Sequence, residues 1–246
     1  MARTFLEQAI DRFLLLSLVS FLDEPIVDTA LQKFVFLSER ELLAKKIEGF
    51  HYVFVKLRFG PYSQELERDK DALVFREFLE DLDERGWILS DKGKIVLEKF
   101  KPLLEKNAEV LSIIKRIVSS HAGTRLRDLL RQVYELRRPL KGEKVTIREL
   151  AERTVLLKPY AFDRPFKISE EEGLRLRIYF DPDVEEVLER SVLGREVLLV
   201  SYRGESGYSA FVPSLPGCVT QGESEEEALK NAEEAITLYL ETVAAT

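Results

Sequence analysis

The histidines and the cysteine are the side chains of this chain whose types most often act as nucleophiles, general bases or metal ligands. The 246 residues contain two histidines and one cysteine, namely His51, His121 and Cys218. A zinc site or a nucleophile–base pair needs several such groups that converge, and none of the three has a second ligand at a useful spacing. We therefore interpret His51 as a structural residue of an aromatic strand, His121 as a residue that interacts with a helix C-terminus, and Cys218 as a small buried residue. The sequence predicts no catalytic residue, no metal and no cofactor.

A series of basic residues offers a different chemistry, the binding of phosphates. Its members are Arg125, Arg127, Arg131, Arg137, Arg138 and Lys141. Apolar residues repeat at helical spacing from Leu126 to Leu136, so we predict a helix there. Arg127, Arg131 and Arg138 would then lie near one face of it, at spacings of four and seven. That face could neutralise the phosphates of nucleic acid, and the alternative is a solvated basic surface without a ligand.

Charge is distributed unevenly along the chain, whose formal net charge is −7. Residues 171–246 hold 16 acidic and 6 basic residues, which gives −10. Residues 91–158 hold 17 basic and 9 acidic residues, which gives +8. This asymmetry predicts a basic region for nucleic acid and an acidic end for a basic protein partner, whereas the alternative is ordinary variation of surface charge between domains.

The composition predicts a globular protein of the cytoplasm. Apolar residues make up 45% of the chain and charged residues 33%, which is typical of a soluble class. The longest apolar run, from Phe13 to Leu22, is half as long as a membrane span, and the N-terminus has no cleavable signal pattern. The single cysteine suits a reducing compartment. The scarcity of Asn, Gln, Met and Cys beside many charged residues favours a thermophilic source.

The elements that would position these residues are clearest near the C-terminus. Residues 196–203 and 208–212 predict the two strands of a hairpin, joined by the glycine-bounded turn 204–207. Pro213 to Gly217 must be a connection, because proline cannot donate to a sheet, and residues 218–221 predict a third strand. Ser224 and Glu227 form a capping-box pattern before a helix whose apolar face comprises Ala228, Ala232, Ala235, Ile236 and Tyr239. The order is β-β-β-α.

This stretch resembles the HicB antitoxin family. The resemblance is carried by Gly207-Tyr-x-Ala-x-Val-Pro-x-Leu-Pro-Gly-Cys218 and by Gln221-Gly-x-Ser-x-Glu-Glu-Ala-x-x-Asn-Ala-x-Glu-Ala-Ile236, and it covers residues 196–242. It implies a reduced ribonuclease H-like fold that neutralises HicA, a small basic RNA-cleaving toxin. Many members also repress their own operon through a separate DNA-binding element. Only Thr242 to Thr246 follow the helix here, so such an element would have to lie upstream.

Ribonuclease H chemistry would require several carboxylates that converge on two metal ions. The strand over residues 196–203 places Val197, Leu199 and Ser201 on one face and Leu198, Val200 and Tyr202 on the other. Neither face presents a central acid, and Glu225 to Glu227 belong to the first turn of a helix, where they favour the helix dipole and solvent. We expect the nuclease site to be absent.

The first part of the chain predicts an α-rich domain. We expect helices over 5–22, 28–48, 64–85, 109–120 and 126–136, with an extended aromatic segment over 50–59, and residues 87–97 form either a hairpin wing or a strand that enters the next helix. Gln32-Lys33-Phe-Val-Phe-Leu37 and Phe59-Gly-Pro-Tyr-Ser63 resemble YwgA-like and Panacea-type winged-helix proteins over residues 5–100. Panacea domains are associated with toxin neutralisation. A winged helix normally reads DNA with its third helix, but the predicted helix 64–85 carries 9 acids against 4 bases.

The proline-containing stretch 158–173 marks a domain boundary. Beyond it we predict a strand over 174–180 and a short acidic helix over 183–191. The fold class is therefore α+β, with an N-terminal α-rich winged-helix-like domain (1–165) and a C-terminal HicB-like β-β-β-α domain of degenerate ribonuclease H-like type (171–246).

These features predict an antitoxin-type protein that neutralises a small basic toxin and represses its own operon, acts as a homodimer and is not an enzyme. We expect the toxin to contact Tyr208, Phe211, Leu215, Pro216, Glu225 and Glu226, with charge speeding association and apolar residues slowing dissociation. One alternative is a DNA- or RNA-binding regulator without a toxin, in which the HicB-like domain serves for oligomerisation. Another is a degenerate metal-dependent nuclease.

Overall fold

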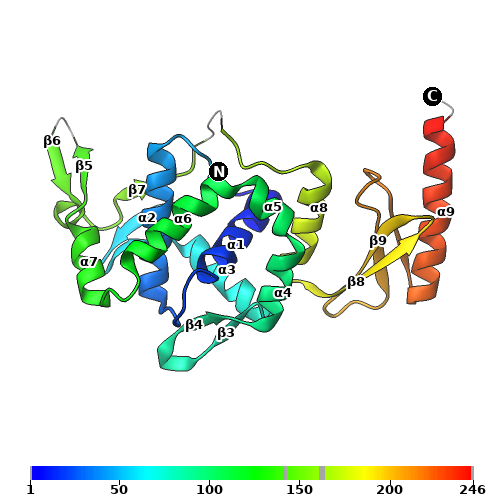
Figure 1. The fold of residues 1–246 in the computed structure, drawn as a ribbon, viewed down its shortest axis with the longest axis horizontal. Helices are drawn as coiled ribbons and strands as arrows, with labels where there is room; N and C mark the ends of the chain where they lie inside the picture. Colours follow the sequence, from blue (N-terminus) through cyan, green and yellow to red (C-terminus); the bar gives the residue numbers. More distant parts are fainter. Residues whose placement is uncertain (1, 141–142, 161–163, 245–246) are drawn as a thin grey trace. The chain divides into compact units, whose positions relative to one another are not determined.

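The computed structural model describes residues 2–140, 143–160 and 164–244, and it divides into two compact units (Figure 1). Unit 1 comprises residues 1–167 and unit 2 comprises residues 168–246. Both units mix helices and strands, so the predicted α+β class is confirmed.

Unit 1 is built around helix α1 (Phe5–Val19), which is buried almost all round from Ala9 to Val19. Thr4 caps it: the Thr4 hydroxyl accepts from Glu7 N at 3.2 Å, and the Glu7 carboxylate accepts from Thr4 N at 2.6 Å. Helices α3 (Gln64–Phe75), α4 (Asp91–Lys99) and α6 (Ala108–His121) pack against α1. Helix α2 (Asp28–Ala44) packs against α6 and α7 (Leu126–Tyr134), and the short helix α5 (Lys101–Lys106) connects α4 to α6.

The strands of unit 1 are short. Strands β2 (Gly60–Tyr62), β1 (Phe54–Leu57) and β7 (Val155–Leu157) form an antiparallel sheet in that order. Strands β3 (Leu79–Asp81) and β4 (Trp87–Leu89) form one hairpin, and β5 (Arg137–Leu140) and β6 (Glu143–Thr146) form another. Two 3-10 turns, η1 (Asp83–Arg85) and η2 (Ile147–Glu149), complete the unit.

Four predicted helices are longer than the observed ones. Helices α1 and α2 end at Val19 and Ala44, before the predicted ends at 22 and 48. The helix predicted over 64–85 ends at Phe75, where Arg76 caps it and Glu77 takes a left-handed conformation (φ 60°) that turns the chain into β3. The helix predicted over 126–136 ends at Tyr134, because residues 137–140 pair with β6. The prediction that Arg138 shares a helical face with Arg127 and Arg131 is therefore wrong. Of the two alternatives for residues 87–97, the strand that enters the next helix is confirmed, since β4 leads into α4.

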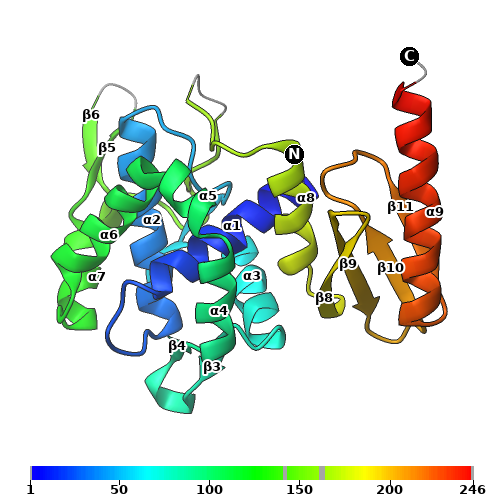
Figure 2. The ribbon, with the colours of Figure 1, turned by 45° about the vertical axis from the view of Figure 1, so that its right-hand side comes forward.

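Unit 2 is a four-stranded antiparallel sheet with a helix on each face (Figure 2). The strand order is β11 (Val219–Gly222), β10 (Tyr208–Phe211), β9 (Arg195–Tyr202) and β8 (Val184–Val192). Helix α9 (Glu225–Ala244) covers the face that carries Val197, Leu199 and Ala210 through Ala228, Ala232 and Ile236. Helix α8 (Glu170–Tyr179) packs through Ile178 on the opposite face, with Leu198 and Val200. The three predicted strands are confirmed within one residue at each end. The final helix is also confirmed, but it continues to Ala244, so residues 242–244, which were predicted to follow it, belong to it.

The two predictions between residues 174 and 191 are exchanged in the structure. Residues 174–180, predicted as a strand, form the C-terminal part of α8, which a capping box begins: the Ser169 hydroxyl accepts from Glu172 N, and the Glu172 carboxylate accepts from Ser169 N. Residues 183–191, predicted as a helix, form edge strand β8, which pairs with β9 along its whole length. Leu193 and Gly194 both have positive φ (49° and 73°), as the type I′ turn of a two-residue hairpin requires.

Candidate partner-binding surface

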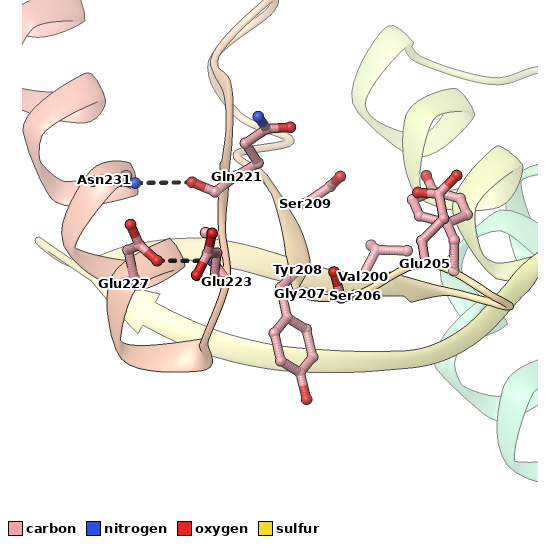
Figure 3. A pocket seen from close by; sticks show the side chains of 12 residues that line it. Val200, Glu205, Ser206, Gly207, Tyr208, Ser209, Gln221, Glu223, Glu227 and Asn231 are labelled. Carbon is pink, nitrogen blue, oxygen red and sulfur yellow. Dashed lines mark hydrogen bonds between the residues drawn. The ribbon is translucent and has the colours of Figure 1, made fainter.

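An acidic hollow of about 460 Å³ opens on unit 2 where β9, β10 and β11 meet the first turns of α9 (Figure 3). Three of its lining residues are the exposed carboxylates Glu205, Glu223 and Glu227. Among the described residues that line it there is no lysine, arginine or histidine. The hollow therefore presents an uncompensated negative surface to solvent.

The walls of the hollow are set by strand alternation. Ser209 pairs with Val200 and Gln221, which places these three side chains on the sheet face away from α9. Tyr208 points to the other side of the strands (Figure 3) and packs against the core beneath α9. Asn231 closes one end, because its side-chain amide donates to Gln221 O at 2.8 Å.

The side chains of Ser224 and Glu227 cap the start of α9, but one of the two hydrogen bonds has a different donor from the one predicted. The Ser224 hydroxyl accepts from Glu227 N at 3.2 Å, as predicted. The Glu227 carboxylate accepts from Glu223 N at 2.8 Å, one residue earlier than the predicted partner. Gly222 lies so close to α9 that a Cβ at this position would come within 2.8 Å of Ala228 Cα. The helix start and the end of β11 are thus in direct backbone contact.

The six residues predicted to bind a toxin do not form one surface. Tyr208 is half-buried at the hollow, and Pro216 is exposed in the β10–β11 connection. Leu215 is only 6% exposed and packs in the core beneath α9, so it supports the fold instead of presenting a contact surface. Phe211 lies on the opposite sheet face, packed against the α8 cluster.

The two glutamates predicted to contact the toxin, Glu225 and Glu226, have different surroundings. Glu226 is exposed, whereas Glu225 is half-buried and pairs with Arg190 Nε at 2.6 Å. Sequence reasoning missed Glu205, Glu223 and Glu227 as members of one site, because only the β10–β11 pairing brings them together. It also missed Val219, which pairs with Phe211 and is 51% exposed. The exposure of Val219 could have been inferred from its place in a short strand beside two turns.

Cys218 is 7% exposed within the core of unit 2, and burial raises the pKa of its thiol. The interpretation of Cys218 as a small buried residue is confirmed. In the parts of the chain that the structure describes, no group of three or more His, Cys, Asp or Glu side chains is arranged to hold a metal ion. The same described residues contain no helix long and apolar enough to cross a membrane.

The residues predicted to bind nucleic acid lie together in unit 1. Arg125 precedes α7, and Arg127 and Arg131 lie on its exposed side. Arg137 and Arg138 lie on β5, and Arg138 donates to Val155 O at 2.5 Å. Lys141 lies outside the described residues. His121, at the end of α6, contacts Ile117 O through Nδ1 at 2.9 Å, as predicted for a residue at a helix C-terminus.

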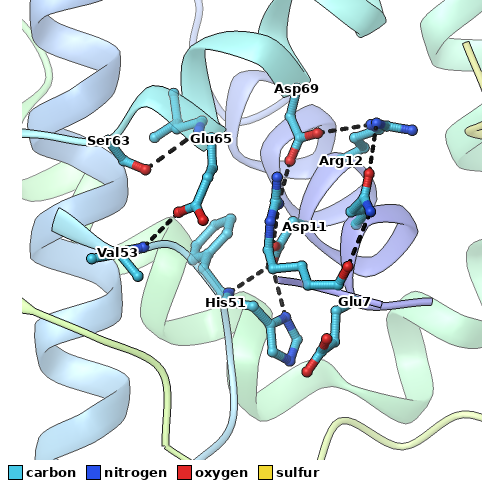
Figure 4. Close-up of polar contacts among 12 residues, drawn as sticks. Glu7, Asp11, Arg12, His51, Val53, Ser63, Glu65 and Asp69 are labelled. Atoms are coloured by element: carbon cyan, nitrogen blue, oxygen red, sulfur yellow. Dashed lines mark hydrogen bonds and ion pairs between the residues drawn. The ribbon is translucent and has the colours of Figure 1, made fainter. Parts of the chain in front are cut away.

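A buried polar network in unit 1 was not predicted (Figure 4). Asp11 is fully buried and accepts from Arg3 at 2.7 Å, from His51 N at 2.8 Å and from His51 Nδ1 at 3.0 Å. Asp69 is 1% exposed and binds Arg3 at 2.5 Å and Arg12 at 2.9 Å. Burial opposes the imidazolium of His51, but hydrogen bonds to Asp11 and Glu48 outweigh it and raise the pKa of His51 to about 10. The structural role predicted for His51 agrees with these contacts, but its predicted place in a strand is wrong, because β1 begins only at Phe54.

Buried carboxylates accept hydrogen bonds from the backbone of residues 50–53, as the carbonyl groups of a neighbouring strand would in a sheet. Residues 50–53 are extended and largely buried but lie outside any sheet. Glu39 accepts from Phe50 N at 2.8 Å, Asp11 accepts from His51 N, and Glu65 accepts from Val53 N at 2.9 Å. Burial raises the pKa of Glu39 to about 8. An acid within an apolar helical pattern, as at Asp11, is the sequence signal for this arrangement.

The two motifs quoted from the first domain lie side by side. Gln32 and Ser63 exchange two hydrogen bonds, from Gln32 Nε2 to Ser63 O at 2.9 Å and from Ser63 N to Gln32 Oε1 at 2.8 Å. The buried Lys33 ammonium donates to Pro61 O at 2.8 Å, and burial lowers the pKa of Lys33 to about 8. Helix α2 therefore fixes strand β2 and the following Ser63 through its own side chains.

Comparison with known proteins concerns the C-terminal segment. Residues 197–246 match the family described as HicB_like antitoxin of bacterial toxin-antitoxin systems. A UPF0150 protein of Helicobacter pylori is 66% identical over 38 residues, which are 15% of this chain and 53% of that protein. UPF0150 proteins of Synechocystis and Thermoplasma acidophilum are 51% and 50% identical over 41 and 42 residues, 17% of this chain in each case. This chain covers 52% of the Synechocystis protein and 61% of the Thermoplasma protein.

The resemblance of residues 197–246 to the HicB-like antitoxin family is therefore confirmed. The family match does not extend to residues 5–100, so the winged-helix resemblance has no support from it. No solved structure matches this chain significantly.

Proposed function

We propose that this chain is an antitoxin-type protein whose unit 2 binds and neutralises a small basic toxin that cleaves RNA. The HicB-like antitoxin match of residues 197–246 supports a role in a toxin–antitoxin system. The role is one of binding, because inhibition of a toxin requires occupation of its surface and no reaction. The observation that carries the proposal is the acidic hollow at β10, β11 and α9, which has no basic residue among its described lining.

Charge favours a basic partner at this place. A protein that cleaves RNA must attract phosphates, so its active surface is positive, and an acidic inhibitor can compete for that surface. Glu205, Glu223 and Glu226 are exposed, and none of them forms an ion pair with the described residues. Their charge is available to a partner, in contrast to that of Glu225, which Arg190 neutralises.

Apolar contacts beside the hollow would hold the complex. Val219 is 51% exposed next to the half-buried Phe211, and Pro216 is exposed in the adjoining connection. Apolar side chains that become buried on binding mainly slow dissociation, whereas exposed charges mainly speed association. The carboxylates of the hollow would speed association, and the apolar residues Val219, Phe211 and Pro216 would slow dissociation. Helices α8 and α9 pack on the sheet that carries both groups.

The proposal is tested by co-expressing the full chain with the product of the adjacent reading frame and measuring growth and binding rates. Glu205→Lys with Glu223→Lys should slow association by about tenfold or more at low salt and less at high salt. Glu185→Lys with Glu186→Lys makes the same change of charge on β8, at the opposite edge of the sheet, and serves as the matched control.

A second pair of variants tests the apolar contact. Val219→Ala should speed dissociation several-fold, whereas Leu193→Ala should not, although Leu193 is exposed to a similar extent (55%) in the β8–β9 turn. Rescue of growth by a chain that carries both charge reversals at the hollow would contradict the proposed site. Absence of any complex with a small basic protein would contradict the proposed function.

A further inference from the structure

The buried charges around Asp11 in unit 1 form one alternating chain (Figure 4). Ion pairs link its members in the order Arg12, Asp69, Arg3, Asp11, His51 and Glu48. Hydrogen bonds to its two acidic neighbours keep His51 protonated at neutral pH, so positive and negative groups alternate and balance. Arg3 is the link between Asp11 and Asp69, the two most deeply buried carboxylates of the chain of charges.

Arg3 differs from the other members in the segment that carries it. The others lie on α1, on α3 or in the packed residues 47–53, whereas Arg3 belongs to residues 2–4, which precede α1. The residues on both sides of Arg3 are exposed, but its own side chain is only 10% exposed. Its carbonyl accepts from the Gln8 amide at 3.2 Å, at the start of α1. Arg3 is therefore an inward-pointing side chain on a segment that otherwise faces solvent.

The guanidinium of Arg3 occupies a site built from buried groups. Its Nη1 donates to Asp11 at 2.7 Å and to Asp69 at 2.5 Å, and these carboxylates are 0% and 1% exposed. Its central carbon lies 5.0 Å from the centroid of the Tyr52 ring, which is fully buried. The Tyr52 hydroxyl is buried near Asp69 and has no acceptor at hydrogen-bonding geometry among the described residues. Two carboxylates and an aromatic face thus meet at one cation, with a buried hydroxyl beside them.

These groups suit a guanidinium better than an ammonium. A guanidinium is planar, presents its donors in a fixed fork and stacks on aromatic rings, whereas an ammonium is compact and strongly hydrated. Without Arg3, Asp11 would keep His51 as a partner and Asp69 would keep Arg12. The loss of Arg3 therefore leaves a single uncompensated negative charge, and one cation of the right shape completes the site again.

We propose that residues 2–4 form a displaceable strap and that the site beneath Arg3 binds small alkylguanidinium molecules in its place. The short tether gives the Arg3 side chain an effective concentration of about millimolar, so a free ligand competes when its own concentration exceeds that range. Displacement loosens the Thr4 cap, because Thr4 lies in the strap and accepts from Glu7 N. The inference concerns unit 1 and does not depend on the function proposed for unit 2.

The first test removes the tethered guanidinium from the full chain and supplies a free one. Arg3→Ala should lower the unfolding temperature of unit 1, followed by Trp87 fluorescence, by about 10 °C, because it breaks a buried ion pair. Agmatine should restore that temperature with a saturable dependence on concentration. Putrescine has an ammonium in place of the guanidinium of agmatine and the same charge, and it should restore much less. Arg116→Ala removes an arginine from an exposed pair with Glu41 and should not respond to either ligand.

The second test uses the wild-type chain and decides the question if Arg3→Ala does not fold. Glu7 N and Gln8 N both donate to Thr4, so hydrogen exchange of these amides reports on the strap. Agmatine well above the millimolar range should speed their exchange several-fold and leave the rest of unit 1 unchanged. A ligand that binds a structural surface without displacing anything would slow exchange instead.

Three outcomes would overturn the proposal. The first is that agmatine does not stabilise the folded Arg3→Ala chain. The second is that putrescine stabilises this variant as well as agmatine does. The third is that the first turn of α1 in the wild-type chain exchanges at the same rate with and without agmatine.

Discussion

Replacing Gly222 with alanine should separate the end of β11 from the start of α9. The φ of Gly222 is not in the left-handed region, so alanine can adopt its backbone conformation. The obstacle is steric, because the new Cβ would meet Ala228 N and lie 2.8 Å from both Ala228 Cα and Glu227 C. Ordinary contact begins at 3.4 Å, so relief of the two 2.8 Å contacts alone requires α9 to move by about 0.6 Å, and the closer Ala228 N requires a larger movement.

The atoms that the alanine would meet belong to backbone, which cannot rotate aside as a flexible side chain can. Overpacking of this kind costs about 1–3 kcal/mol, and we expect the upper half of that range. The lower entropy of alanine in the unfolded chain offsets about 0.4–1 kcal/mol. The expected net loss in unfolding free energy of unit 2 is therefore about 2 kcal/mol, which corresponds to about 30-fold faster exchange of protected amides.

Hydrogen exchange followed by mass spectrometry suits this measurement, because the single tryptophan, Trp87, lies in unit 1 and reports on that unit alone. Amides of β10, β11 and the first turns of α9 should exchange faster, while the Trp87 unfolding transition stays unchanged. Gly194→Ala is the control: it meets no atom within 4 Å but has φ 73°, so it introduces backbone strain without overpacking. Its effect should be greatest at the β8–β9 turn. Unchanged exchange in β11 for Gly222→Ala would refute the argument from close approach.

Three further predictions concern the cap, a turn and the buried network. Ser224→Ala should lower the stability of the α9 start by ~1 kcal/mol, measured as faster exchange of its first-turn amides. Leu193→Asn should raise the stability of unit 2 by about 0.5–1 kcal/mol, since asparagine before glycine suits a type I′ turn, and a calorimetric melt would detect it. The folded-state pKa of His51 is raised from 6.5 to about 10, so its stabilisation is complete below pH 6.5 and is lost as pH rises toward 10. Trp87-monitored unfolding should therefore show falling stability over that window, by up to about 1.4 kcal/mol per pH unit, and His51→Gln should flatten the curve.

The sequence was sufficient for the C-terminal hairpin and helix because local signals agree there. Glycines bound the turn at 204–207, prolines exclude the connection from the sheet, and Ser224 marks the helix start. Each of these residues acts on its own neighbourhood, and the observed elements follow them closely. Side-chain exposure was harder to predict, as Leu215 illustrates, because it depends on how the connection folds back over the core.

The exchange of helix and strand over 174–191 has a physical cause in the apolar spacing. In α8, Leu174, Leu176 and Ile178 alternate with arginines, a pattern typical of a strand, although Leu176 and Tyr179 are both buried in the helix. In β8, Val184, Val187 and Leu188 have helical spacing. They fit a strand because Val187 packs with the α8 cluster and Leu188 with the α9 core, on opposite faces of the sheet. Whether residues 183–191 form a helix or a strand is decided only by their pairing with β9.

In unit 1 the sequence indicated extended structure over 50–59, but it could not show that residues 50–53 lack a strand partner. The groups that satisfy this segment are far away in sequence, 40 residues for Asp11 and His51 and 11 for Glu39 and Phe50. The basic series illustrates the same limit. Its residues were identified, but the division of Arg131 and Arg138 between a helix and a hairpin depends on the β5–β6 pairing.

The carboxylates beneath residues 50–53 have a consequence for how the protein tolerates mutation. A buried leucine can usually be exchanged for methionine or isoleucine at modest cost, because volume is what the core requires. Positions 11, 39 and 65 require an acceptor atom at a fixed place, since an apolar residue of equal size would leave a backbone amide with no acceptor. In a saturation library selected for folded protein, these three acidic positions should therefore accept fewer substitutions than most aliphatic positions around them. Positions 11, 39 and 65 would then be the polar positions of α1, α2 and α3 that tolerate few substitutions. They would mark where residues 50–53 pass these helices.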